Sequence, residues 1–324
     1  MNGKSRPEGR PQTPAKASTQ ILAAPADETS DSRLSALYKT SQLQRFRRTK
    51  SELATLDAAI VTAVETETPV TVRGVFYRVV SAGGVEKSEK GYGAVQRRLL
   101  HLRRTRVVPY SSITDGTRLR LKPDSWSDID QMLADAASSY RRALWDDQDV
   151  DVIIVCEKDA ISGVVYPVTA EFDVELCITR GYSSETFTHS IAQTVQANTS
   201  RAGKRTFLYQ LGDHDPSGVD AWREFSEKVR GFARGADVEF ARIAVTPQQI
   251  ALWNLPTRPT KNTDSRAAKF VGESVEVDAI PATQLRALLR AAIEQHVDPE
   301  ALRLTQLAED SERDILHRLA GVGL

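Results

Sequence analysis

The sequence predicts a multi-domain α/β protein, in which a helical N-terminal part is followed by a parallel sheet covered by helices. Two observations predict this. Short apolar runs at 152–156 and 206–212 alternate with helical patterns, as strands of a buried parallel sheet do. Residues 51–104 instead carry amphipathic helical stretches. The 324 residues are enough for about two domains.

Residues 1–33 are rich in Pro, Ser, Thr, Ala, Gly and Lys and contain few large apolar residues. Such a segment cannot bury enough apolar surface to fold, so we expect a disordered basic arm. Apolar residues at helical spacing begin at Leu34. The first folded domain is therefore expected to cover residues 34–122.

Three helices are predicted within residues 34–122. The first covers 51–66 and ends at Thr68-Pro69, the second runs over 72–80 after Thr71, and the third runs over 89–104 after Ser88. A short extended segment with a turn at Gly116 follows them. Three helices and a small hairpin are typical of a winged-helix (CAP-like) domain, whose third helix lies in the major groove of DNA.

The formal net charge of the chain is zero, but its charges are unevenly distributed. Residues 73–106 contain nine Lys or Arg against two Glu, which favours contact with a polyanion. Lys261 and Arg266 in a later loop are weaker candidates for the same role. The candidate DNA contacts are Arg78, Arg97, Arg98, Arg103, Arg104, Arg106 and Lys158.

Residues 123–150 follow helical spacing and are interpreted as a connecting helix. The sheet domain is expected over 151–324, with further strands at 174–179 and 240–245 and a strand-like segment at 275–280. Helices are expected between the strands, and two amphipathic helices, over 282–297 and 300–320, end the chain.

Acidic residues follow both apolar runs directly. Glu157 ends the first run, and Asp213 and Asp215 end the second. Because parallel strands present functional residues at their carboxyl ends, these carboxylates are expected to converge on a Mg²⁺ site. As an alternative, they are helix caps or loop residues. Glu276 and Asp278 are further candidates for an outer ligand.

A second chemical signal is Tyr77, which lies four residues after Arg73 on the predicted second helix and therefore shares its face. Arg73 and Arg78 could favour the phenolate and hold a phosphate, so that the tyrosine attacks a phosphodiester. The alternative for Tyr77 is a core aromatic residue. Tyr92 and Tyr110 are interpreted as packing residues.

The pattern of strand, Glu157 and Lys158, followed by strand and Gly212-Asp-His-Asp-Pro-Ser-Gly218, resembles the Toprim domain of topoisomerases, primases and some nucleases. The Arg-x-x-Phe-Tyr sequence of residues 73–77, placed before such a domain, resembles the A subunit of topoisomerase VI and its relative, the meiotic double-strand-break protein. The resemblance covers about residues 50–300 and is closest to compact "mini-A" forms.

This resemblance implies Mg²⁺-dependent double-strand cleavage, with Tyr77 as the nucleophile that becomes linked to a 5′ end. It also implies a homodimer, in which the tyrosine of one subunit works at the metal acids of the other. Complete topoisomerase (isomerase) activity would require a separate ATPase subunit of the B type. Two alternatives remain, a Toprim nuclease that uses water and a non-catalytic DNA-binding protein.

Two cysteines, Cys156 and Cys177, lie in apolar runs without zinc-ligand spacing and are expected to be reduced core residues. The sequence contains no membrane-length apolar run and no signal-peptide pattern. We therefore expect a cytoplasmic, nucleoid-associated protein. Its DNA target and its biological role are left open.

Overall fold

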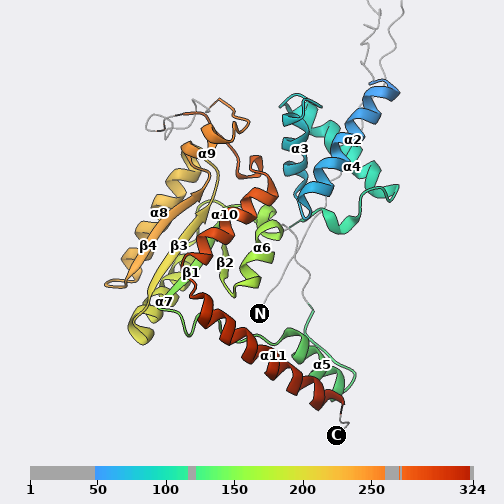
Figure 1. Ribbon diagram of the computed structural model, residues 1–324. Coiled ribbons are helices and arrows are strands. Elements are labelled where there is room, and N and C mark those ends of the chain that lie inside the picture. Colours follow the sequence, from blue (N-terminus) through green and yellow to red (C-terminus); the bar gives the residue numbers. More distant parts are fainter. Residues whose placement is uncertain (1–47, 116–121, 260–269, 271, 322–324) are drawn as a thin grey trace, which may run out of the picture. The chain divides into compact units, whose positions relative to one another are not determined.

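Parallel strands form the sheet of this protein, whose computed structural model describes residues 48–115, 122–259, 270 and 272–321 (Figure 1). Within these residues the strands are β1 (Val150–Cys156), β2 (Glu175–Ile178), β3 (Arg205–Leu211) and β4 (Val238–Ala244), in the order β2-β1-β3-β4. Cys156 lies opposite both Ile178 and Leu211, so β1, β2 and β3 end together. The predicted α/β class is confirmed.

Helices cover both faces of the sheet (Figure 1). Helices α7 (Glu185–Ala202) and α8 (Pro216–Phe232) pack on the face to which Ile153 and Val155 point. Helices α6 (Ser162–Glu171) and α10 (Ala282–Glu294) cover the opposite face, to which the alternate residues of β1 point. Burial on both faces explains why the strands read as continuous apolar runs.

The three helices predicted before the sheet are present as α2 (Lys50–Glu67), α3 (Val72–Ser81) and α4 (Glu89–Arg104). Local caps fix their starts, because the hydroxyl of Thr71 accepts the Gly74 amide at 2.8 Å and that of Ser88 accepts the Gly91 amide at 3.1 Å. Their apolar faces meet in one core that includes Leu56, Ile60, Val79, Val95 and Leu99.

The segment after α4 departs from the predicted hairpin where it is described. It contains the turn η1 (Tyr110–Ser112), and Ile113 forms a single parallel bridge with Val70. The predicted turn at Gly116 lies outside the described residues. The winged-helix assignment therefore stays a prediction.

The predicted connecting helix over 123–150 is shorter in the structure. Helix α5 (Ile129–Ser139) starts at the cap Asp128 and packs against α11 (Pro299–Gly321), as Figure 1 also shows. Tyr140 then takes an extended backbone conformation, which ends the helix despite the continuing apolar spacing.

The predicted strand-like segment at 275–280 is also corrected. Val275 forms an isolated antiparallel bridge with His214, and the turn η4 (Val277–Ala279) follows. The remaining described elements are η2 (Asp159–Ile161) and α9 (Pro247–Leu252).

By their contacts, residues Arg48–Leu324 form one unit. The predicted arm over 1–33, the apolar stripe that begins at Leu34, and the loop residues Lys261 and Arg266 lie outside the described residues. Cys156 and Cys177 are both free and buried, as expected. Among the described helices, none combines the length and the apolar character needed to cross a membrane.

Candidate active site

The three acids singled out in the sequence lie at the carboxyl edge of the sheet. Glu157 directly follows β1, and its amide donates to the carbonyl of Leu211, the last residue of β3, at 2.9 Å. The Asp213 amide in turn donates to Glu157 Oε2 at 3.0 Å. A Cβ atom at Gly212 would lie 2.6 Å from this oxygen, and one at Gly218 would lie 2.9 Å from it. The two glycines therefore leave the space that the carboxylate occupies.

Burial shifts the pKa values of two of these acids. Burial, together with the charges of Asp213 and Asp215, raises the pKa of Glu157 to about 7. Burial also raises the pKa of Asp213, against the opposing effect of Lys158. The site thus concentrates negative charge at one edge of the sheet.

Lys158 neutralises much of this charge from within the chain. Its ammonium nitrogen lies 2.9 Å from Asp213 Oδ2, 3.2 Å from Glu276 Oε2 and 3.3 Å from Asp278 Oδ2. Burial alone would lower the pKa of Lys158, but the three carboxylates outweigh it and raise the pKa above its ordinary value. The other oxygen of Asp213, Oδ1, accepts the Val277 amide at 2.9 Å. Both oxygens of Asp213 are therefore engaged.

Asp215 serves as the N-cap of α8, as the alternative interpretation of the sequence anticipated. Its Oδ1 accepts the Gly218 amide at 2.8 Å, and its Oδ2 lies 3.4 Å from Arg258 Nη2. Within the part of the chain that the structure describes, no three His, Cys, Asp or Glu side chains are arranged so that they could hold a metal ion. The three carboxylates instead face amides, Lys158 and Arg258.

Glu276 joins the sheet edge to the helix that carries Tyr77. Its Oε1 accepts a hydrogen bond from Arg73 Nη1 at 3.1 Å and lies 3.2 Å from Arg258 Nη1, while its Oε2 faces Lys158. Burial opposes ionisation of Glu276, but Lys158 and Arg73 outweigh it and lower the pKa. Asp278 extends the same network, because its Oδ1 accepts the Thr71 hydroxyl at 2.6 Å.

Tyr77 is buried, with 2% of its surface exposed. Its ring packs against Phe76 at 5.3 Å, and Lys87 Nζ lies 5.4 Å from the ring centroid. Lys87 also donates to the carbonyl of Pro256 at 2.7 Å, which holds the loop after α9 close to this region.

Burial, together with the charge of Glu276, raises the pKa of Tyr77 to about 12. Arg73 and Lys158 oppose it without overcoming it. Arg78 bonds to the Ala279 carbonyl and pairs with Glu67. Arg73 therefore favours the phenolate, as expected, but its effect is smaller than that of burial, so the pKa of Tyr77 stays above its ordinary value.

A cavity of about 700 Å³ opens beside the network. Lys158, Asp213 and Arg103 are among its lining residues. Tyr92 also lines it, with the Arg73 guanidinium 4.9 Å from the centroid of its ring, whereas Tyr77 is not part of the described lining. Tyr92 packs against Phe76, with 5.3 Å between the ring centroids, as the sequence predicted, and it lines the cavity as well, which the sequence did not indicate.

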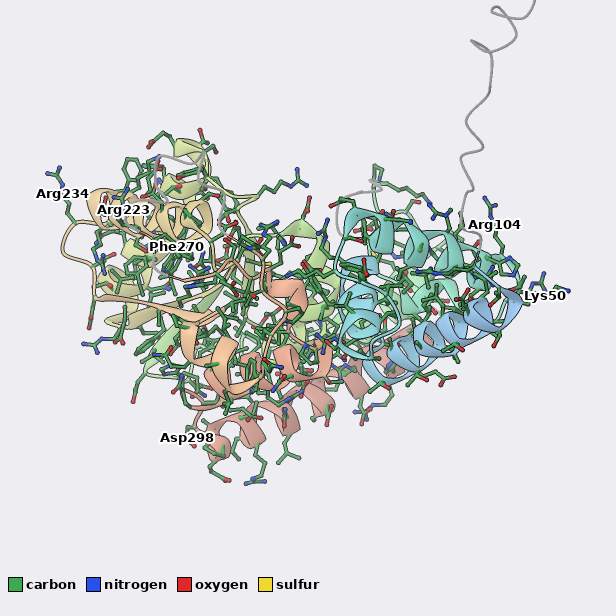
Figure 2. The ribbon with its side chains drawn as sticks, turned by 90° about the horizontal axis from the view of Figure 1, so that it is seen from above. Lys50, Arg104, Arg223, Arg234, Phe270 and Asp298 are labelled. Atoms are coloured by element: carbon green, nitrogen blue, oxygen red, sulfur yellow. The ribbon has the colours of Figure 1, made fainter. Side chains whose placement is uncertain are left out.

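The predicted DNA contacts fall into two groups. Arg97, Arg104 and Arg106 are exposed on or just after α4; Arg104 is labelled in Figure 2. Arg103 stacks on Tyr110 with 4.3 Å between the guanidinium carbon and the ring centroid. Arg98 is engaged within the chain, because it donates to both oxygens of Asp57, at 2.7 and 2.5 Å.

Arg78 and Lys158 are engaged within the chain in the same way. The guanidinium of Arg78 is half-buried between Glu67 and η4. Lys158 differs from Arg78 because it also lines the cavity.

Sequence reasoning missed Arg242, which lies on β4 beside the acid-bearing strand. Its Nη2 donates to the Asp213 carbonyl, while its Nε and Nη1 are buried without a hydrogen-bond partner among the described residues. Its charge faces Glu157, Asp213 and Asp215, and burial lowers its pKa. The signal in the sequence that could have identified Arg242 is a charged residue inside the strand predicted over 240–245.

A scan of the chain against protein-family models finds no matching family, and a search of curated proteins finds no match. The fold and the site therefore define the class, an α/β protein with a charged network at the carboxyl edge of a parallel sheet. The network offers hard oxygen donors, a phenol and cationic groups around one cavity, a combination suited to a phosphate ester.

Proposed function

We propose that this protein is a Mg²⁺-dependent DNA-cleaving enzyme of the topoisomerase VI A-subunit type, in which Tyr77 attacks a backbone phosphate. One observation carries the proposal. Arg73, one helical turn before Tyr77, is bonded to Glu276, and Glu276 shares Lys158 with Asp213. The phenol-bearing helix and the sheet-edge acids thus belong to one polar network.

DNA would be bound by the helical part, proposed here as a winged-helix domain. Arg97, Arg104 and Arg106 are exposed and free to contact phosphates, and Arg103 lies at the cavity. Contacts of this kind position the duplex without reading its sequence. They also make binding weaken steeply as salt rises.

Mg²⁺ would be held by Glu157, Asp213 and Asp215, within a proposed Toprim domain. The chemistry of the donor set suits the ion, because carboxylate oxygens are the ligands that Mg²⁺ prefers. In the described arrangement these oxygens face amides, Lys158 and Arg258, so they would have to exchange those partners for the ion. When bound, the ion would supply positive charge close to the departing oxygen.

In the proposed reaction the Tyr77 hydroxyl loses its proton to water, and its oxygen forms a bond to phosphorus. The bond from phosphorus to the 3′ oxygen breaks, and that oxygen leaves with the electron pair and takes up a proton. The 5′ end stays linked to the protein, so the reverse reaction can reseal the strand. Because the Tyr77 ring packs against Phe76 and lies close to Lys87, the surrounding side chains must move before the hydroxyl can attack.

A homodimer would cut both strands, with the tyrosine of one protomer working at the acids of its partner. In the described arrangement Tyr77 is buried and is not among the residues that line the cavity of its own protomer. Passing one duplex through another would in addition need a separate ATPase subunit.

A second candidate is a nuclease in which water attacks. It is favoured by the cavity, which reaches Asp213 and Lys158 directly while Tyr77 stays covered. In this reaction the product ends carry no protein.

The test uses the full chain with Mg²⁺ and a 3′-labelled duplex, stopped with detergent and resolved by electrophoresis. Label should migrate with the protein, and Tyr77→Phe should reduce that signal to background. Tyr92→Phe is the matched control, since Tyr92 lines the cavity and should leave the adduct intact. Glu157→Gln should abolish cleavage while DNA binding persists.

Each alternative gives a different result. Cutting without an adduct, unchanged in Tyr77→Phe, would establish the water nuclease. An adduct that survives Tyr77→Phe but disappears in Tyr92→Phe would transfer the nucleophile to Tyr92. DNA binding with no cleavage under any condition would leave a non-catalytic DNA-binding protein.

A further inference from the structure

Lys158 lies where its charge blocks one of the acids needed for a metal ion. Its ammonium is 2.9 Å from Asp213 Oδ2, and the Val277 amide occupies Asp213 Oδ1. Asp213 itself is only 7% exposed. In this arrangement, Asp213 has no oxygen free for another cation.

The same lysine lines the cavity of about 700 Å³, together with Arg73 and Arg103. A lysine is a compact charge on a flexible stem of four carbons, so its head group can change partners while its Cα stays fixed. A phosphate oxygen entering the cavity offers Lys158 an anionic partner in place of Asp213.

We propose that Lys158 couples the binding of DNA phosphate to the binding of a divalent cation at Asp213. The ammonium moves from Asp213 to the phosphate, and Asp213 Oδ2 becomes available as a ligand. This inference rests on the proposed function and adds an order of binding to it, in which DNA binds and so prepares the site for the metal ion.

Charge balance makes each step unfavourable by itself. Removing Lys158 alone leaves Asp213, Glu276 and Asp278 without their shared cation, and uncompensated buried charge is strongly destabilising. Adding a divalent cation alone places it beside an ammonium. When phosphate takes up Lys158 and the ion replaces it, neither penalty remains.

Such coupling is reciprocal, so DNA tightens the binding of the ion by the same factor as the ion tightens the binding of DNA. A lysine with a purely structural role would support the fold but would not link the two affinities. The link between the affinities is therefore the quantity to measure.

The experiment uses Mn²⁺ as the probe, because free Mn²⁺ gives an electron paramagnetic resonance signal that disappears on binding. Titrations are made on the Tyr77→Phe chain, which should not cut, with and without a short duplex, and binding to DNA alone is subtracted. We expect DNA to tighten Mn²⁺ binding by roughly 5- to 150-fold, the usual range of coupling between sites. The reciprocal measurement is DNA affinity by fluorescence anisotropy, with and without Mn²⁺.

Adding Lys158→Met should give tight Mn²⁺ binding without DNA and remove most of the effect of DNA. The control is Lys228→Met, because Lys228 also faces two acids, Glu185 and Glu224, and its side chain is 26% exposed against 25% for Lys158. The control should keep the full coupling. Should the Lys158→Met chain fail to fold, the titration of the Tyr77→Phe chain still overturns the inference if DNA leaves Mn²⁺ binding unchanged.

Two results would overturn the inference alone: Mn²⁺ binding that is tight and indifferent to DNA with Lys158 intact, or full coupling in Lys158→Met. An absence of Mn²⁺ binding in every chain, with and without DNA, would remove the metal site itself and the coupling with it. The two failures are therefore distinguishable.

Discussion

At the scale of single residues, the site depends on a glycine, whose lack of a side chain leaves room for a carboxylate. Gly212 gives Glu157 its space, since a Cβ there would lie 2.6 Å from Glu157 Oε2 and 2.8 Å from Gln210 Nε2. Gly212→Ala should therefore displace the Glu157 carboxylate. Because the atoms that the Cβ meets are the ends of side chains, which can move aside, the free energy of unfolding should fall by about 1 kcal/mol, the low end of the cost of overpacking. The loss of stability is measured by chemical denaturation, and cleavage should fall with it.

The control for this prediction is Gly231→Ala near the end of α8, where a Cβ would meet nothing within 4 Å. Alanine is the better helix former by about 1 kcal/mol, so this variant should be at least as stable as the parent. Equal effects of the two substitutions would show that the close approach at Gly212 is unimportant.

At the scale of elements, helix α3 is held at its start by a threonine with two roles. Thr71 accepts the Gly74 amide at 2.8 Å and donates to Asp278 Oδ1 at 2.6 Å. Thr71→Ala should lose the cap, worth about 0.5–2 kcal/mol, and about 1–3 kcal/mol more for the buried acceptor left unpaired. Denaturation midpoints provide the measurement.

Helix α2 supplies the comparison, because Thr49 caps it in the same way at an exposed position and accepts the Glu52 amide at 3.2 Å. Thr49→Ala should lose only the cap. If both alanine variants lost the same stability, the bond from Thr71 to Asp278 would contribute nothing.

At the scale of the whole molecule, α10 is fastened to the end of α2. Arg286 donates to the carbonyls of Pro69 at 3.1 Å and of Glu67 and Thr68 at 3.3 Å. Arg286→Ala should reduce the free energy of unfolding by roughly 2–4 kcal/mol, because hydrogen bonds from charged groups contribute about 1.5–3 kcal/mol each and these three share one donor group. Thermal unfolding followed by circular dichroism measures the loss.

Arg290 lies one turn further along α10 and pairs with Glu171, with both side chains well exposed. Arg290→Ala should reduce stability by no more than about 1 kcal/mol, as exposed ion pairs do. A loss as large as that of Arg286→Ala would mean that the three hydrogen bonds to carbonyls do not account for the loss of stability in Arg286→Ala.

Features set by neighbouring residues were predictable from the sequence. The caps Thr71 and Ser88 act within three residues, and α4 begins and ends where its pattern predicted. The placement of Glu157 and Asp213 at one edge followed from the rule that parallel strands end together.

Features set by distant residues were not predictable. Lys158 meets Glu276 across 118 positions of sequence, and Thr71 meets Asp278 across 207. No local pattern reports such pairs, so the engagement of the acids by Lys158 emerged only from the fold. The segment at 275–280 read as a strand because apolar spacing does not reveal whether a neighbouring strand is available beyond a single bridge.

The backbones of Arg258 and Ser274 exchange two hydrogen bonds, each 2.9 Å long, and so close the stretch of chain between them at its base. From its position at this pair of hydrogen bonds, the Arg258 side chain forms ion pairs with Asp215 and Glu276. Closing a longer loop costs little extra entropy, about 0.6 kcal/mol for each doubling of length. The stretch can therefore gain residues while the charged centre keeps its composition, provided that Phe270 keeps its ring contact with His214, whose centroid lies 4.8 Å away.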